Sequence, residues 1–303
     1  MNERQFGKSL GSPVVLGCMR MAGMAKEDAD KLIGTAMENG ICSFDHADIY
    51  GGGESEKLFG QVLAGRPGLR EGMFIQSKCG IRQGMYDLSE EYILDAVDGI
   101  LERLHTDYLD LLILHRPDAL MEPEEIAEAF DRLTESGKVR RFGVSNMNAG
   151  QIALLQYWIH TDLWVDQMQL SLAHSLLVDE GINVNMADKP GEVHTGGTLD
   201  YCRLHRIAVQ CWSPLQYGFF EGTFLESSRY PELNEVLEEI ASRYEVTKGA
   251  VAVAWLLRIP GVEQAIVGTT KEKRVGELSK AAQIRLTREE WYRLYRSAGN
   301  RLP

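Results

Sequence analysis

The chain has 303 residues, of which 44% are hydrophobic and 25% are charged, which is the composition of a globular protein rather than a collagen-like or disordered one. The formal net charge of -12 argues against a nucleic-acid or membrane-surface partner, because either would need a broad basic field. The five cysteines lack the spacing of a zinc site or a disulfide framework, and the first residues lack a secretory signal, so reduced thiols and a cytoplasmic location are expected.

Short apolar runs typical of buried strands recur eight times along the chain. They lie at residues 14–17, 42–45, 73–77, 109–114, 142–144, 165–168, 207–211 and 262–267. Stretches with helical periodicity lie between them, for example at residues 27–39, 89–104, 122–136, 148–157 and 230–243. Strands that are apolar on both faces are typical of a parallel sheet covered by helices. Eight such repeats favour a closed barrel, so we predict an α/β fold, a single-domain (β/α)8 TIM barrel over residues 1–303.

Local signals support the helix boundaries and draw attention to two loops. Ser89 precedes two glutamates as an N-cap would, and Gly40 and Gly137 stand where helices should end. Two long loops, 171–196 and 213–228, follow predicted strands. Long loops in compact barrels are commonly functional, and barrel active sites lie at the C-terminal ends of the strands.

Four polar residues stand at the C-terminal ends of three neighbouring predicted strands: Asp45, Tyr50, Lys78 and His115. Singly, each has an ordinary explanation, as a turn cap, a packing aromatic, a solvated lysine or a satisfied strand-end histidine. Their convergence on one barrel mouth favours an active site. We expect the Lys78 ammonium to lower the pKa of Tyr50, Asp45 to hold the lysine charged, and a neutral His115 to donate a hydrogen bond to a substrate oxygen. The set would place a proton donor beside a polarised carbonyl.

A second cluster follows the next predicted strands. Ser145, Asn146 and Gln167 can hydrogen-bond a primary carboxamide through both its oxygen and its nitrogen. The alternative is helix capping by Asn146 or Asn148. Trp212 offers an aromatic plane for a flat ring, although a lone tryptophan is more often part of the core.

The last predicted strand is followed by a polar segment that opens a helix. Barrels frequently bind phosphate at this position, and the segment supplies hydroxyls and cations at residues 268–274. A solvated charged helix face is the alternative. Arginine and lysine with hydroxyl donors suit a phosphate monoester better than a ribose diol. No Gly-x-Gly-x-x-Gly follows the first predicted strand, so a Rossmann-type site is not expected.

These motifs resemble the aldo-keto reductase superfamily over about residues 6–282. The run Phe-Asp-His-Ala-Asp-Ile-Tyr-Gly at 44–51 is similar to the family signature around its catalytic Asp and Tyr, and the segments at 76–78 and 112–118 match those of its lysine and histidine. The resemblance implies a (β/α)8 barrel with the active site at the C-terminal strand ends. It also implies NADPH or NADP as cofactor without a metal, and a catalytic tetrad of Asp45, Tyr50, Lys78 and His115.

The same resemblance implies where the cofactor would lie. The nicotinamide would be held by Ser145, Asn146, Gln167 and Trp212. The remainder would lie against Ser213, Leu215, Gly218, Gly268, Thr269, Thr270, Lys271, Arg274 and Glu277. Two positions depart from the family pattern: Trp212 replaces the usual tyrosine or phenylalanine, and Leu278 stands where an adenine-contacting asparagine is often found. The loops that shape substrate pockets in the family, here 20–24, 171–196 and the tail after 286, match no interpretable pattern.

The function expected from the sequence is an NADPH-dependent oxidoreductase that reduces a small aldehyde or ketone to an alcohol, with Tyr50 as general acid. One alternative is an NADPH-binding regulatory or sensor module with slow turnover. Another is a metal-dependent hydrolase using Asp45, His46, Asp48 and His115, which is disfavoured because no His-x-His pair ends the first strand. No motif encodes the physiological substrate, the net direction or the oligomeric state.

Overall fold

The computed structural model describes residues 10–186, 192 and 194–302. Eight parallel strands close into a barrel in the order β1-β12-β9-β8-β7-β6-β3-β2. They are β1 Val14–Gly17, β2 Ser43–Asp45, β3 Phe74–Cys79, β6 Leu111–Leu114, β7 Phe142–Ser145, β8 Leu163–Gln169, β9 Ala208–Trp212 and β12 Val262–Val267. All eight predicted strands are therefore confirmed, with ends that differ by a few residues.

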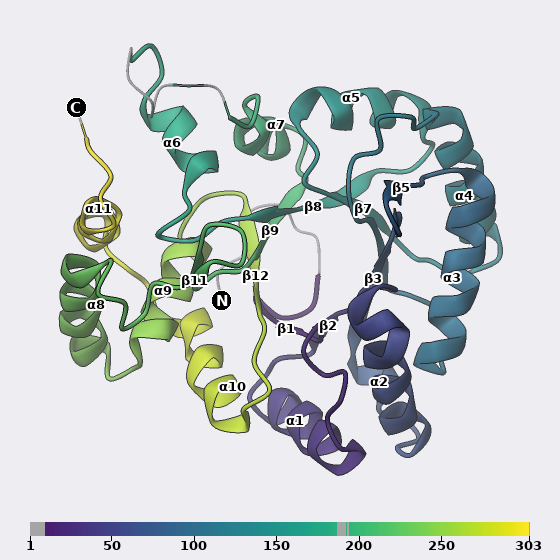
Figure 1. Cartoon of the computed structure of the whole chain (residues 1–303), viewed down its shortest axis with the longest axis horizontal. Helices are drawn as coiled ribbons and strands as arrows, with labels where there is room; N and C mark the ends of the chain where they lie inside the picture. The colour runs from purple at the N-terminus through teal and green to yellow at the C-terminus, as the bar shows by residue number, and fades with distance from the viewer. Residues whose placement is uncertain (1–9, 187–191, 193, 303) are drawn as a thin grey trace.

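Helices form a ring around the barrel (Figure 1). They are α1 Lys26–Glu38, α2 Glu54–Ala64, α3 Glu90–Leu104, α4 Pro123–Glu135, α5 Ala149–Trp158, α6 Leu176–Ile182, α7 Thr198–Leu204, α8 Pro231–Tyr244, α9 Lys248–Leu257, α10 Glu272–Ser279 and α11 Arg288–Ser297. The five predicted helical stretches correspond to α1, α3, α4, α5 and α8. In the described ranges, no helix is long and apolar enough to cross a membrane.

The predicted helix ends are confirmed, with one difference of detail. Gly40 and Gly137 follow α1 and α4 with φ of 75° and 72°, the left-handed region that glycine enters without steric cost. Ser89 occupies the N-cap position of α3, but its hydroxyl donates to Asp87 at 2.7 Å instead of accepting from the helix.

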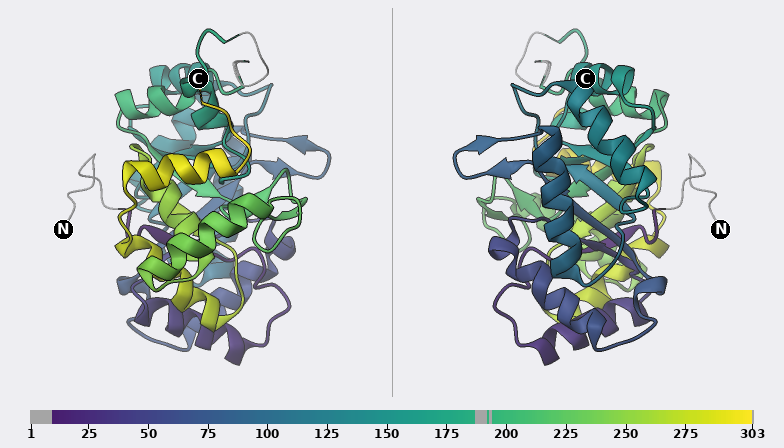
Figure 2. Two further views of the ribbon diagram at one scale, coloured as in Figure 1. Left: turned by 90° about the vertical axis from the view of Figure 1, so that its left-hand side faces the viewer. Right: turned by 90° about the vertical axis from the view of Figure 1, so that its right-hand side faces the viewer.

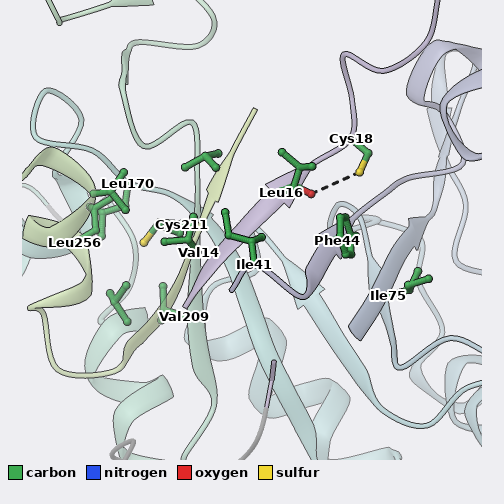
Figure 3. Close-up of a cluster of buried hydrophobic side chains, with 14 of the residues drawn as sticks. Val14, Leu16, Cys18, Ile41, Phe44, Ile75, Leu170, Val209, Cys211 and Leu256 are labelled. Carbon is green, nitrogen blue, oxygen red and sulfur yellow. Dashed lines mark hydrogen bonds between the residues drawn. The ribbon is translucent and has the colours of Figure 1, made fainter. Parts of the chain in front are cut away.

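Apolar side chains fill two regions, one between barrel and helices and one inside the barrel. Outward-facing residues of the strands, such as Leu16, Phe44 and Val209, are fully buried in the first region, which also holds Leu256 of α9 (Figure 3). Burial of each such side chain stabilises the fold by roughly 1.5–3 kcal/mol. A separate cluster consists of Leu10, Phe74, Leu111, Ile113, Val165 and Ala208. Polar side chains also lie inside the barrel, because Gln76 of β3 and Gln210 of β9 hydrogen-bond to each other from opposite sides of it.

Two short hairpins and the short helix α6 lie in the loops between barrel elements. The β4–β5 hairpin (Ile81–Arg82 and Met85–Tyr86) projects from the barrel, as Figure 2 shows. The predicted loop 213–228 contains a second hairpin, β10 Gln216–Tyr217 with β11 Gly222–Thr223. The predicted loop 171–196 contains helix α6, while its residues 187–191 and 193 lie outside the described residues.

Candidate active site

A cavity of about 1190 Å³ opens at the C-terminal ends of the barrel strands, where the sequence predicted the site. Asp45, Tyr50 and His115 line it, and so does Arg274 of α10. The described residues of segment 171–196 and of the tail after 286 do not line it, whereas Arg20 does. The cavity therefore joins the predicted catalytic residues to the predicted phosphate segment.

Tyr50 is followed by a turn of three glycines that all lie in the left-handed region. It opens the 3-10 helix Tyr50–Gly53, in which Gly51, Gly52 and Gly53 have φ of 60°, 66° and 91°. A Cβ on Gly51 would come within 2.3 Å of the Cβ of Ala22. The run of three glycines thus lets the chain turn sharply directly after Tyr50, which lines the cavity.

Lys78 donates a hydrogen bond to the phenol oxygen of Tyr50. The lysine is fully buried at the end of β3, and its Nζ donates to Asp45 Oδ2 at 2.8 Å, to the His46 carbonyl at 2.8 Å and to Tyr50 Oη at 3.1 Å. All three ammonium donors are therefore used. Burial lowers the pKa of Lys78, but Asp45 and Tyr50 outweigh it and leave the pKa raised, so the lysine is charged.

The pKa of Tyr50 differs from the expectation. Burial raises the pKa of the phenol above its usual value of 10, and the Lys78 ammonium, although it lowers the pKa as predicted, does not reverse the shift. The effect of Lys78 has the predicted direction, but burial, which the sequence does not reveal, outweighs it. The phenol keeps its proton at neutral pH, as a proton donor requires.

His115 is a neutral imidazole. Burial, together with the charges of Lys78 and Arg116, lowers its pKa to about 2. Its ring meets that of Tyr50 edge to face with centroids 6.1 Å apart, and its buried Nδ1 has no partner among the described residues. A neutral imidazole beside the phenol can donate one hydrogen bond to an oxygen in the cavity, as predicted.

The predicted carboxamide-binding residues come together on the neighbouring strand ends. Ser145 Oγ donates to the carbonyl of Gln167 at 2.8 Å and accepts from Asn146 Nδ2 at 2.7 Å. Asn146 lines the cavity, whereas Asn148 caps α5 through a capping box with Gln151. The capping alternative therefore applies to Asn148 and not to Asn146.

Most of the remaining predicted cofactor residues lie along the cavity. Ser213, Leu215, Gly268, Thr269, Arg274 and Glu277 line it together with Trp212, whereas Gly218, Thr270 and Lys271 are not part of its lining. In the described part of the chain, no carboxylate lies within ion-pair distance of Arg274. A cation in the cavity wall with no acidic partner among the described residues suits an anionic group.

Sequence reasoning missed several lining residues. Thr247 and Lys248 open helix α9, where Thr247 caps the helix by accepting from Ala250, and Lys248 pairs with Glu226 and with Glu238 at 3.5 Å. The threonine before an apolar run is an N-cap signal that could have revealed this helix start.

The residues considered for a metal site do not converge. Asp45 is paired with Lys78. Both ring nitrogens of His46 are buried without partners among the described residues, and its ring meets that of Phe59 edge to face with centroids 4.5 Å apart. Among the residues that the structure describes, no three His, Cys, Asp or Glu side chains form a group that could hold a metal ion. The metal-dependent hydrolase alternative thus has no ligand set here.

Known proteins resemble this chain over nearly its whole length. The model of the "Aldo/keto reductase family" matches residues 13–297. An uncharacterized oxidoreductase of Bacillus subtilis, YcsN, is 38% identical, covering 94% of this chain and 93% of its own. A 6-dehydroglucose reductase of Novosphingobium aromaticivorans is 34% identical, with 99% and 97% covered.

Solved structures agree with this match. A thermostable aldo-keto reductase in complex with the inhibitor epalrestat has a TM-score of 0.76 at 26% identity, covering 96% of this chain and 98% of that one. An aldo-keto reductase from Klebsiella pneumoniae, solved in complex with NADPH, has a TM-score of 0.74 at 25% identity, with 94% and 90% covered.

Proposed function

This chain belongs to the aldo/keto reductase family, and from that premise we propose that it reduces an aldehyde or ketone to an alcohol with NADPH, with Tyr50 as proton donor. The observation that carries the proposal is the buried Asp45–Lys78–Tyr50 chain at the edge of the cavity, in which Lys78 Nζ lies 3.1 Å from the phenol oxygen. The oxidoreductase relatives support the reaction class.

The cavity has the polar groups that NADPH needs. Asn146 Nδ2 uses one of its two N–H groups on Ser145, which leaves the other for a carboxamide oxygen, and Trp212 offers an aromatic face nearby. Arg274 supplies a cation for a phosphate. The Klebsiella pneumoniae structure holds NADPH, which favours the same cofactor here. When bound, NADPH supplies the hydride that reaches the carbonyl carbon.

The tetrad supplies the proton. The raised pKa of Tyr50 keeps the phenol protonated at neutral pH until the carbonyl oxygen gains negative charge. The Lys78 ammonium then stabilises the phenolate that remains, because it already lies within hydrogen-bond distance. Neutral His115 donates to the same substrate oxygen and orients it.

Steady-state oxidation of NADPH tests the proposal with a panel of aldehydes and ketones. The panel includes 6-dehydroglucose, because one relative bears that substrate in its name. Tyr50→Phe should lower kcat by about 10²- to 10⁴-fold while NADPH binding is retained. Tyr92→Phe is the matched control, because its hydroxyl donates to Asp48 at 3.2 Å and not to the tetrad. Full turnover by Tyr50→Phe contradicts the assigned role, and tight NADPH binding without turnover on any substrate favours a regulatory module instead.

A further inference from the structure

Four glutamines form a polar layer inside the barrel, next to the tetrad. Gln76, Gln167, Gln210 and Gln264 belong to β3, β8, β9 and β12, and none is more than 3% exposed. Barrel interiors are ordinarily filled by branched apolar side chains, and a buried amide is costly unless it is hydrogen-bonded. The donors and acceptors of all four side-chain amides therefore need hydrogen-bond partners inside the protein or in the cavity.

Strand register brings these residues together. Asp45 on β2 stands opposite Gln76 on β3, while Gln210 on β9 stands opposite Gln167 on one side and Gln264 on the other. The pair on β2 and β3 meets the three glutamines on β8, β9 and β12 across the barrel, because Gln76 and Gln210 hydrogen-bond to each other from opposite walls. The layer is thus a product of barrel closure.

One end of the layer is anchored on the backbone before β1. Gln264 Nε2 donates to the carbonyls of Leu10 at 2.7 Å and Ser12 at 2.8 Å. Both N–H groups are then used, so Gln264 Oε1 accepts from Gln210 Nε2 at 2.6 Å. The second N–H of Gln210 donates to Gln76 Oε1 at 2.8 Å. The backbone carbonyls, which can only accept, set the direction of every later bond.

The other end of the layer is the catalytic carboxylate. Gln210 Oε1 accepts from Gln76 Nε2 at 3.1 Å and from Gln167 Nε2 at 3.0 Å. The remaining N–H groups of Gln76 and Gln167 donate to Asp45 Oδ1 at 2.6 Å and 3.0 Å. Gln210 thereby makes four hydrogen bonds, the full capacity of an amide with two donors and two lone pairs.

This directed set of bonds fixes the orientation of Gln167. Both of its N–H groups point inward, to Asp45 and Gln210, and no group among the described residues donates to its Oε1. Gln167 lines the cavity, whereas Gln76, Gln210 and Gln264 do not. Its amide therefore offers an oxygen, not a nitrogen, to a ligand, and an oxygen is the partner for the NH2 of a primary carboxamide.

We propose that Gln76, Gln210 and Gln264 are positioning residues that orient the Gln167 amide toward the nicotinamide carboxamide and hold the Asp45 carboxylate at the same time. The inference rests on the proposed function, because it requires nicotinamide beside Gln167. It connects recognition of the coenzyme to the tetrad through residues that touch neither substrate nor coenzyme.

A coenzyme analogue separates positioning from simple packing. The probe is 3-acetylpyridine adenine dinucleotide phosphate, which keeps the ring carbonyl of NADP+ but lacks the carboxamide NH2. Wild type should bind NADP+ about 3- to 10-fold more tightly than the analogue, the effect of one neutral hydrogen bond. Gln210→Met keeps the side-chain volume but removes the four hydrogen bonds. It should bring the ratio of the Kd values for the analogue and NADP+ to within about twofold. Leu111→Met, in the apolar cluster of the barrel interior, should leave the ratio as in wild type.

Gln264→Met provides a second, independent variant, because it removes only the anchor and can be measured even where Gln210→Met does not fold. It should also narrow the ratio, with kcat lowered more than in Leu111→Met. An unchanged ratio in the folded glutamine variants overturns the inference and assigns the layer to packing alone. A wild type that binds both coenzymes equally overturns it as well, whereas a wild type that binds neither overturns the proposed function itself.

Discussion

Trp212 donates its indole N–H to Asn146 Oδ1 at 3.3 Å, so the aromatic plane on β9 and the amide that follows β7 are fixed to each other. Asn146 has a φ of 57°, a left-handed conformation that costs free energy in a residue other than glycine. Asn146 also donates one of its two amide N–H groups to Ser145. With the amide oxygen bonded to the indole, the second N–H remains for a ligand. This bond gives tryptophan a role here that phenylalanine, which has no ring N–H, could not fill.

Trp212→Phe should keep an aromatic face but release Asn146. We expect the Kd for NADPH to rise about fivefold, because one neutral hydrogen bond contributes about 1 kcal/mol. Isothermal titration calorimetry measures this change without relying on tryptophan fluorescence. The control is Trp158→Phe, since Trp158 is 40% exposed on α5. Equal affinity in Trp212→Phe and wild type would show that the indole N–H has no part in holding Asn146.

Arg274 should set the preference for NADPH over NADH. Its guanidinium lines the cavity without an acidic partner in the described ranges, so an adenosine 2'-phosphate can take a charge-assisted hydrogen bond worth about 1.5–3 kcal/mol. Arg274→Ala should narrow the ratio of kcat/KM values for the two coenzymes by about 10- to 100-fold, mainly through NADPH. Lys273→Ala is the matched control on the same helix, because Lys273 is 89% exposed and pairs with Glu277. An unchanged ratio in Arg274→Ala removes this arginine from the site.

The barrel and the tetrad were predictable because their signals are local. Each strand is a short apolar run between turn residues, and Tyr50, Lys78 and His115 lie just at or after the ends of such runs. In a parallel barrel, strand ends share one face, so sequence position alone places these side chains together. Helix α9 was missed because eight of its ten residues are buried, and a helix that is apolar nearly all round lacks amphipathic periodicity.

The polar layer and the pKa of Tyr50 could not be predicted, because both depend on distances across the closed barrel. Gln76 and Gln210 are 134 positions apart, and nothing near either residue indicates the other. The pKa of Tyr50 is the result of two opposing effects, burial and the charge of Lys78, and their balance is set by atomic geometry. The sequence identifies the residues whose effects on the pKa oppose each other, but it does not tell which effect is larger.

The buried carboxyl of Asp48 should make stability depend on pH. Burial raises its pKa to about 6, with the Tyr92 hydrogen bond acting in the opposite sense, and its Oδ1 has no partner among the described residues. Between about pH 4 and pH 6 the unfolded chain loses this proton while the folded chain keeps it, so stability falls as pH rises. The loss approaches at most about 3 kcal/mol and is complete above pH 6.

Asp48→Asn removes this titration. Its free energy of unfolding in urea, relative to wild type, should therefore rise between pH 4 and pH 7 by up to about 3 kcal/mol. Asp95→Asn, at an exposed site on α3, reports the effect of removing a carboxylate that is not buried. A difference between Asp48→Asn and wild type that stays constant with pH, or grows toward low pH, contradicts the prediction.

Gly51→Ala should damage the fold and the chemistry together. A left-handed φ costs a residue with a Cβ about 1–2 kcal/mol, and the new methyl would meet Ala22, for a total of about 2–4 kcal/mol. Since Gly51 follows Tyr50 directly, kcat should fall as the phenol is displaced from Lys78. Gly84→Ala is the matched control: its φ is 78°, but a Cβ there meets nothing within 4 Å and it lies in the β4–β5 turn. Urea unfolding and steady-state kinetics should show about 1 kcal/mol of destabilisation with normal kcat for Gly84→Ala. If both variants lose stability and activity equally, the strain at Gly51 does not position Tyr50.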